Sequence, residues 1–252
     1  MIVSRKIWNS YISGLRKVND EAARLANEYL ISHNVLTPEG TDALIEYCYG
    51  LATKYGEAAT ELAAEMYDAL ALASGVRVPP AIPADTATMQ ETASAVMGTL
   101  KTGNNDIISG AVGRLVKMAG VDTTMQNALR DGAEWAWIPV GDTCAFCITL
   151  ASRGWQEASK KSIKGGHAEH IHANCDCTYA IRFDRSSNVE GYDPGKYLAM
   201  YDDQPGVNPD QKINSLRRSL YAENREKILA QKRSAYEKSQ ELESSAAEEA
   251  DL

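Results

Sequence analysis

The chain has 252 residues, of which 44% are hydrophobic and 24% charged, with a formal net charge of −8 at pH 7 and a pI near 5.1. This composition is typical of a folded domain with a sizeable core, and the acidic balance argues against a protein whose main partner is a nucleic-acid backbone. No apolar run approaches the roughly eighteen residues of a membrane span, and the first residues lack the apolar core of a secretion signal.

The first third of the chain predicts two long helices joined by a short turn. Apolar residues recur at alternating spacings of three and four, which marks one face of a helix. The first helix ends near residues 33–34, and Thr37-Pro38 predicts the start of the second because Pro is favoured at the first helical position. Gly75 closes the second helix, so an antiparallel helical hairpin is expected. The apolar faces comprise Trp8, Tyr11, Leu15, Val18, Ala22, Leu25 and Tyr29, then Leu44, Cys48, Leu51, Tyr55, Ala58, Leu62, Met66, Ala69 and Ala73.

Residues 76–84 contain three prolines and predict a semi-stiff linker. Three further helices are expected after it. The first begins at Asp85-Thr86, the second runs from Ile107 to Gly120, and a short third runs from Asp122 to the Asp131-Gly132 break. Residues 1–132 are therefore predicted to form a helical region.

The character of the sequence changes after residue 132. Residues 134–140 and 178–183 have strand-like composition and flank a cysteine-rich segment, so residues 133–184 are predicted to form a small α+β module. Residues 185–252 are expected to form a Gly- and Pro-rich loop, a helix starting near Asp210 and an acidic tail. Eight basic and three acidic residues lie within 211–240, whereas the last twelve residues contain no base. Such charge blocks predict a solvated helix and a disordered tail.

The most specific motif is a pair of cysteine clusters. Cys144 and Cys147 form a CxxC pair, and His172, Cys175 and Cys177 form an HxxCxC group that begins 25 residues later. Thiolates are strong Zn²⁺ ligands, and two such groups brought together by a loop complete a tetrahedral shell. Clustered thiols in a chain without a secretion signal also favour a reducing compartment and a metal over disulfides. The sequence therefore predicts a structural zinc ion.

Five candidate ligands compete for four positions. Cys144, Cys147 and Cys175 rank first, and the fourth ligand is His172 or Cys177. Asp142 is expected to cap a helix whose first turn carries Cys144 and Cys147, where the helix N-terminus lowers thiol pKa values. Cys48 lies on the apolar face of the second helix and is predicted to be a small buried hydrophobe instead.

Other interpretations of the motif remain open. A strand, a CxxC pair and a helix also occur in thioredoxin-like redox proteins, but that hypothesis leaves the second cluster unexplained. A metal-dependent nuclease built on His167, His170 and His172 would need a further ligand-bearing helix. A catalytic zinc would keep one coordination position open, whereas the surplus of ligands here favours a closed, structural site.

The strings at residues 141–154 (GDTCAFCITLASRG) and 172–177 (HANCDC) resemble the minor head proteins of tailed bacteriophages, in the group related to protein F of phage Mu. The resemblance covers residues 134–184. The region before it matches that group only in being helical, and no motif is shared there. It implies a structural minor capsid protein that acts in head morphogenesis and associates with the portal or the major capsid protein. The expected location is the virion, at the capsid interior or the head–tail connector, and the host cytoplasm during assembly.

The resemblance also implies several copies per virion. Some relatives are described as capsid maturation proteases, so a protease or another zinc-dependent hydrolase or nuclease is the alternative function. No protease triad is apparent that does not share residues with the metal site. The partners are expected to be proteins, and the basic stretch 211–240 is the one segment with a possible weak contact to DNA. No membrane association is expected.

Overall fold

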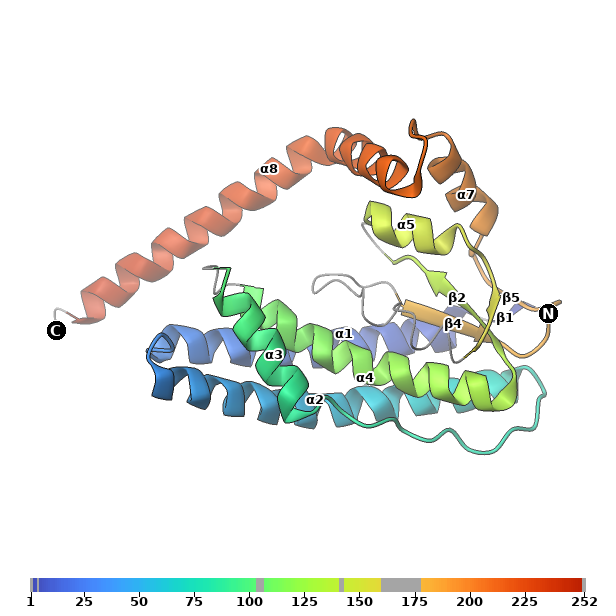
Figure 1. Ribbon diagram of the computed structural model, residues 1–252, viewed down its shortest axis with the longest axis horizontal. Helices are drawn as coiled ribbons and strands as arrows, with labels where there is room; N and C mark the ends of the chain where they lie inside the picture. The colour runs from blue at the N-terminus through green and yellow to red at the C-terminus, as the bar shows by residue number, and fades with distance from the viewer. Residues whose placement is uncertain (1, 4, 103–106, 141–142, 160–177, 251–252) are drawn as a thin grey trace.

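The computed structural model describes residues 2–3, 5–102, 107–140, 143–159 and 178–250, and the fold is mainly helical with a small sheet (Figure 1). The helices are α1 (Arg5–Ser32), α2 (Pro38–Ala73), α3 (Met89–Leu100), α4 (Ile107–Asp131), α5 (Ala145–Ala151), α7 (Pro194–Asp202) and α8 (Pro209–Ala250). The strands are β1 (Ile2–Val3), β2 (Glu134–Ile138), β3 (Gln156–Glu157), β4 (Thr178–Arg182) and β5 (Asn188–Val189). No helix among the described residues is both long and apolar enough to cross a membrane.

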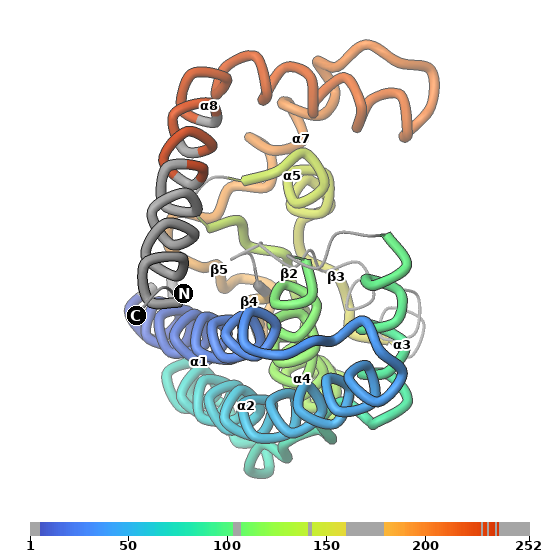
Figure 2. The backbone as a smooth tube through the Cα atoms, turned by 90° about the vertical axis from the view of Figure 1, so that its left-hand side faces the viewer, coloured from blue at the N-terminus to red at the C-terminus, as the bar shows by residue number. Residues whose placement is uncertain are grey.

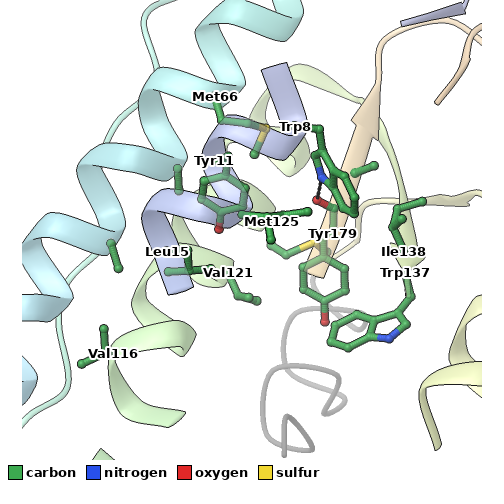
Figure 3. Close-up of a cluster of buried hydrophobic side chains, with 14 of the residues drawn as sticks. Trp8, Tyr11, Leu15, Met66, Val116, Val121, Met125, Trp137, Ile138 and Tyr179 are labelled. Carbon is green, nitrogen blue, oxygen red and sulfur yellow. Dashed lines mark hydrogen bonds between the residues drawn. The ribbon is translucent and has the colours of Figure 1, made fainter. Parts of the chain in front are cut away.

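The predicted hairpin of α1 and α2 is confirmed, and α4 packs along both of its helices (Figures 1 and 2). Thr37 caps α2, accepting a hydrogen bond from the Gly40 amide, with Pro38 at the first helical position. Helix α4 covers the part of the apolar faces of α1 and α2 that these two helices do not bury against each other. The core therefore lies where α1, α2 and α4 meet the sheet, and Figure 3 shows part of it.

The prediction of two helices with a break at Gly120 was wrong, because α4 is one continuous helix. A Cβ atom at this glycine would lie 3.1 Å from the carbonyl oxygen of Ala59 and 3.2 Å from the hydroxyl of Tyr11. Gly120 therefore allows α4 to approach α1 and α2 closely, and it does not end the helix.

Two other helix boundaries differ from the expectation. Helix α3 begins at Met89, after a Thr88 cap, and not at Asp85-Thr86; the Thr88 side chain and Glu91 form a reciprocal capping box. Helix α7 lies within the predicted loop, since Asp193 caps it and Pro194 starts it. Helix α8 continues through Ala250, where a disordered tail was predicted, because this acidic segment is rich in Glu and Ala, which favour helix.

The segment 76–88 lies along α4 and is held there through its backbone. The Asn127 side chain accepts from the Ile82 amide and donates to the Ile82 carbonyl, each at 2.9 Å. The Thr123 hydroxyl accepts from the Ala84 amide, also at 2.9 Å. Arg130 donates to the carbonyl oxygens of Pro79 and Pro80 at 2.9 and 3.0 Å. We call residues 78–84 the strap.

The two predicted strands are confirmed as β2 and β4, which pair antiparallel in a three-stranded sheet of order β3-β2-β4 with β2 at its centre. Strands β1 and β5 form a separate parallel pair. Behind the sheet, α5 packs against α7 and the first turns of α8, in a small cluster formed by Ala145, Ile148 and Leu216. Beyond these turns α8 extends away from the rest of the molecule (Figure 1).

Candidate metal centre

The pairing of β2 with β4 places side by side the strand ends that lead, along the chain, to the two halves of the cysteine motif. Ile138, the last residue of β2, is opposite Thr178, the first residue of β4. Cys177 directly precedes Thr178 in the chain, and Cys144 follows Ile138 by six residues. The two segments that carry the candidate ligands are therefore connected in the chain to adjacent strand ends.

Helix α5 and its N-cap supply the two described cysteines of the motif. Cys144 is the N-cap of α5, and its sulfur accepts a hydrogen bond from the Cys147 amide at 3.5 Å. This corrects the prediction that Asp142 caps the helix; Asp142 itself lies outside the described residues. The Cys147 side chain is buried, whereas Cys144 is partly exposed.

Aromatic side chains form the wall next to Cys147. The Tyr179 ring makes edge contacts with Trp135 and Trp137, with centroids 4.9 and 4.8 Å apart. Burial raises the pKa of the Tyr179 phenol well above its usual range, and the charges of Asp122 and Cys147 raise it further. Tyr179, near the start of β4, and Cys147, in α5, both belong to the buried core cluster.

The other predicted ligands, His172, Cys175 and Cys177, lie outside the described residues, as do His167 and His170. Within the described ranges, no three His, Cys, Asp or Glu side chains lie close enough to hold one metal ion. The described chain thus contributes two of the five candidate donors, Cys144 and Cys147, and does not form a complete site with these alone.

Cys48 behaves as the sequence predicts for a small buried hydrophobe. Its side chain is fully buried in the core, and burial raises the pKa of its thiol to about 12. A neutral thiol in an apolar environment is neither a nucleophile nor a metal ligand.

One anchor of this region was missed in the sequence. The indole N–H of Trp8, at the start of α1, donates to the Tyr179 carbonyl oxygen at 2.9 Å across 171 residues of sequence (Figure 3). The helical face of Trp8 was recognised from its spacing, but a hydrogen bond to a strand so far along the chain leaves no periodic signal.

These features define a mainly helical protein with a small sheet, in which Cys144 caps, and Cys147 lies within, the helix that follows β2. A model of the VG15 protein family matches residues 2–204, which is most of the chain and ends before α8. The chain belongs to the VG15 protein family and is therefore a viral gene product. Comparison with curated proteins and with solved structures found no match.

Proposed function

We propose that this chain is a structural minor capsid protein of a tailed bacteriophage, which acts in head morphogenesis at the portal or the capsid interior and contains a structural zinc ion. The observation that carries the proposal is the pairing of Ile138 with Thr178, which sets side by side the strand ends that connect to the two halves of the cysteine motif, in a member of a viral family. The resemblance of residues 134–184 to phage minor head proteins gives the motif its functional context.

The donor set suits a structural zinc. Cys144 and Cys147 would bind the ion from the start of α5, and the remaining ligands would come from His172, Cys175 and Cys177. Zinc prefers thiolate and imidazole ligands in a closed tetrahedron, and such a site contributes directly to folding. The ion would fix α5 against the end of the β2–β4 pair.

Fixing α5 would also orient α8. The first turns of α8 pack on α5 through Leu216, with Ile213 and Leu220 beside it. Side chains from 221 to 227 are exposed, including Tyr221. An exposed helix beyond the docked turns suits contact with a partner, since the apolar faces of α1 and α2 are buried against α4. The acidic balance of the chain favours a protein partner over DNA.

Co-expression with the portal protein of the same genome tests the proposal. We expect a complex that survives size exclusion at moderate salt. A chain ending at residue 222 keeps the docked turns of α8 and should lose the complex, whereas a matched control ending at residue 240 should retain it. Metal analysis of protein purified under reducing conditions should find about one zinc per chain.

Two outcomes would contradict the proposal. The first is a chain that does not bind the portal protein in either form. The second is cleavage of the purified capsid or scaffold protein by this chain, which would favour the maturation-protease alternative.

A further inference from the structure

Helix α8 has two parts, the first turns that pack on the rest of the chain and an extension that leaves it (Figure 1). Ile213, Leu216 and Leu220 recur at spacings of three and four, and they pack with side chains of α5 and α7. Seven residues after Leu220 the same helical face carries Lys227, whose side chain is exposed. The apolar face that docks α8 therefore ends at Leu220, and about 45 Å of helix follow it at 1.5 Å per residue.

The extension carries a second apolar pattern, which repeats every seven residues and begins where the docked face ends. The repeating pairs are Tyr221-Ala222, Ile228-Leu229 and Ala235-Tyr236, and Leu242 follows at the next repeat. The side chains of Tyr221 and Tyr236 are 49% and 66% exposed. A seven-residue apolar repeat keeps one stripe facing a partner helix as the two helices supercoil. The pattern therefore indicates a coiled coil along the extension.

The charges along α8 indicate which helix is the partner. Residues 211–240 contain eight basic and three acidic residues, whereas the twelve that follow contain no base. A parallel pair of α8 helices would place basic beside basic and acidic beside acidic, which is repulsive. An antiparallel pair places the acidic end of each helix along the basic part of the other. Each α8 contains both complementary parts, so a second copy of the same helix matches it.

We propose that α8 pairs with α8 of a second copy of this chain, as an antiparallel two-stranded coiled coil over residues 221–250. Such a contact is isologous, so both copies contribute the same stripe and every charge contact is made twice. The docked turns stay on α5, and the two helical bodies lie at opposite ends of the paired helices. The inference does not depend on the proposed role in the capsid, since a helix in a two-stranded coil keeps its outer surface for other partners.

Sedimentation equilibrium of the full chain tests the pairing, and we expect a dimer of the 27.5 kDa chain. A chain ending at residue 222 should be a monomer. Leu229→Glu places a charge on the apolar stripe and should weaken the dimer about tenfold or more, because the charge loses its water in the coiled coil. Ala230→Glu is the matched control. Ala230 is exposed and lies about two and a half turns after Tyr221, on the opposite side of the helix, so the dimer should be unchanged.

The acidic end tests the orientation of the pair. Glu241→Gln, Glu243→Gln, Glu248→Gln and Glu249→Gln together keep the shape of this end and remove its charge. An antiparallel dimer should be weakened, and added salt should reduce the difference from the wild type because salt screens the charges. A parallel dimer would instead be strengthened, since its acidic ends would no longer repel each other.

Three results would overturn the proposal. The first is a full chain that is monomeric at every concentration, and a monomer that still binds the portal protein would leave the proposed function standing. The second is a Leu229→Glu dimer, folded by its thermal unfolding, that is as tight as the wild-type dimer. The third is a dimer that the four glutamine substitutions strengthen.

Discussion

The helical body formed by α1 to α4 and the sheet region around α5 are stabilised in different ways. The helices are long, and they bury continuous apolar faces against one another. Strands β2 and β4 have five residues each, β3 has only two, and α5 has seven. Elements this short are marginal without additional support. The body is therefore stabilised mainly by apolar faces that recur along its helices, whereas the sheet region depends on individual contacts such as the hydrogen bond from Trp8 to Tyr179.

The strongest test of this difference removes one cysteine from each region. If the proposed zinc ion is bound, Cys147→Ser should release it and unfold the sheet region, because a structural zinc site contributes on the order of 10 kcal/mol to folding. Cys48→Ser is the matched control, since its thiol is also buried but lies in the body. It should cost about 1–3 kcal/mol and retain the metal. Zinc content and urea unfolding of both variants provide the measurement, and equal effects would refute the distinction.

The second prediction concerns the contact that joins the two regions. Trp8→Ala removes a fully buried indole and its hydrogen bond to Tyr179, and should lower the free energy of unfolding by about 3–5 kcal/mol. Trp8→Phe keeps most of the apolar surface but leaves a carbonyl without its donor, so a loss of about 1–3 kcal/mol is expected. Chemical unfolding followed by tryptophan fluorescence measures both. Equal stability of Trp8→Phe and the wild type would show that the hydrogen bond contributes nothing.

A third prediction tests how the body holds the strap. Asn127→Ala removes both hydrogen bonds to Ile82 and should cost about 1–3 kcal/mol. It should also make the strap a preferred site of limited proteolysis, whereas in the wild type we expect cleavage in the loops after β4. Gln126→Ala, at the neighbouring position on α4, is the control. Unchanged protease sensitivity of Asn127→Ala would mean that the strap is held by other contacts.

The smallest expected effect has the opposite sign. Burial and the negative charge of Glu91 raise the folded-state pKa of Asp122 to about 6, so this group favours folding below the pKa of the unfolded chain and loses that contribution as pH rises through 6. Asp122→Asn should therefore stabilise the protein by on the order of 2 kcal/mol at about pH 7.5 and by clearly less at about pH 5. The charged and titratable groups around Asp122 are Asp85, Glu91, Arg114 and Tyr179. Thermal unfolding at the two pH values measures the difference, and a stabilisation independent of pH would contradict the assignment.

The body was largely predictable from sequence because apolar residues recur at helical spacing along its long helices. The seam from Trp8 to Tyr29 and the Thr37-Pro38 start gave the hairpin, and strand composition gave β2 and β4. The break at Gly120 was predicted wrongly because a glycine required for close packing is indistinguishable in sequence from one that ends a helix. The strap contacts were missed, since they depend on side chains meeting backbone that is distant in sequence. The burial of Asp122 was missed because it depends on tertiary packing. The cysteine motif was recognisable from its spacing, and its four ligands remain a prediction.

The strap has a consequence for how this chain tolerates sequence change. Its contacts with Thr123, Asn127 and Arg130 all reach backbone amide and carbonyl groups, and Ile82 within it is largely exposed. Substitution of strap side chains therefore leaves these bonds intact, provided that the amides of residues 82 and 84 are kept. The constraint falls on α4, where replacing any of the three polar residues breaks a contact. In related viral proteins we expect the exposed strap positions to vary, while Val78 and Ala81, which pack against the core, and the polar side of α4 that faces the strap stay the same.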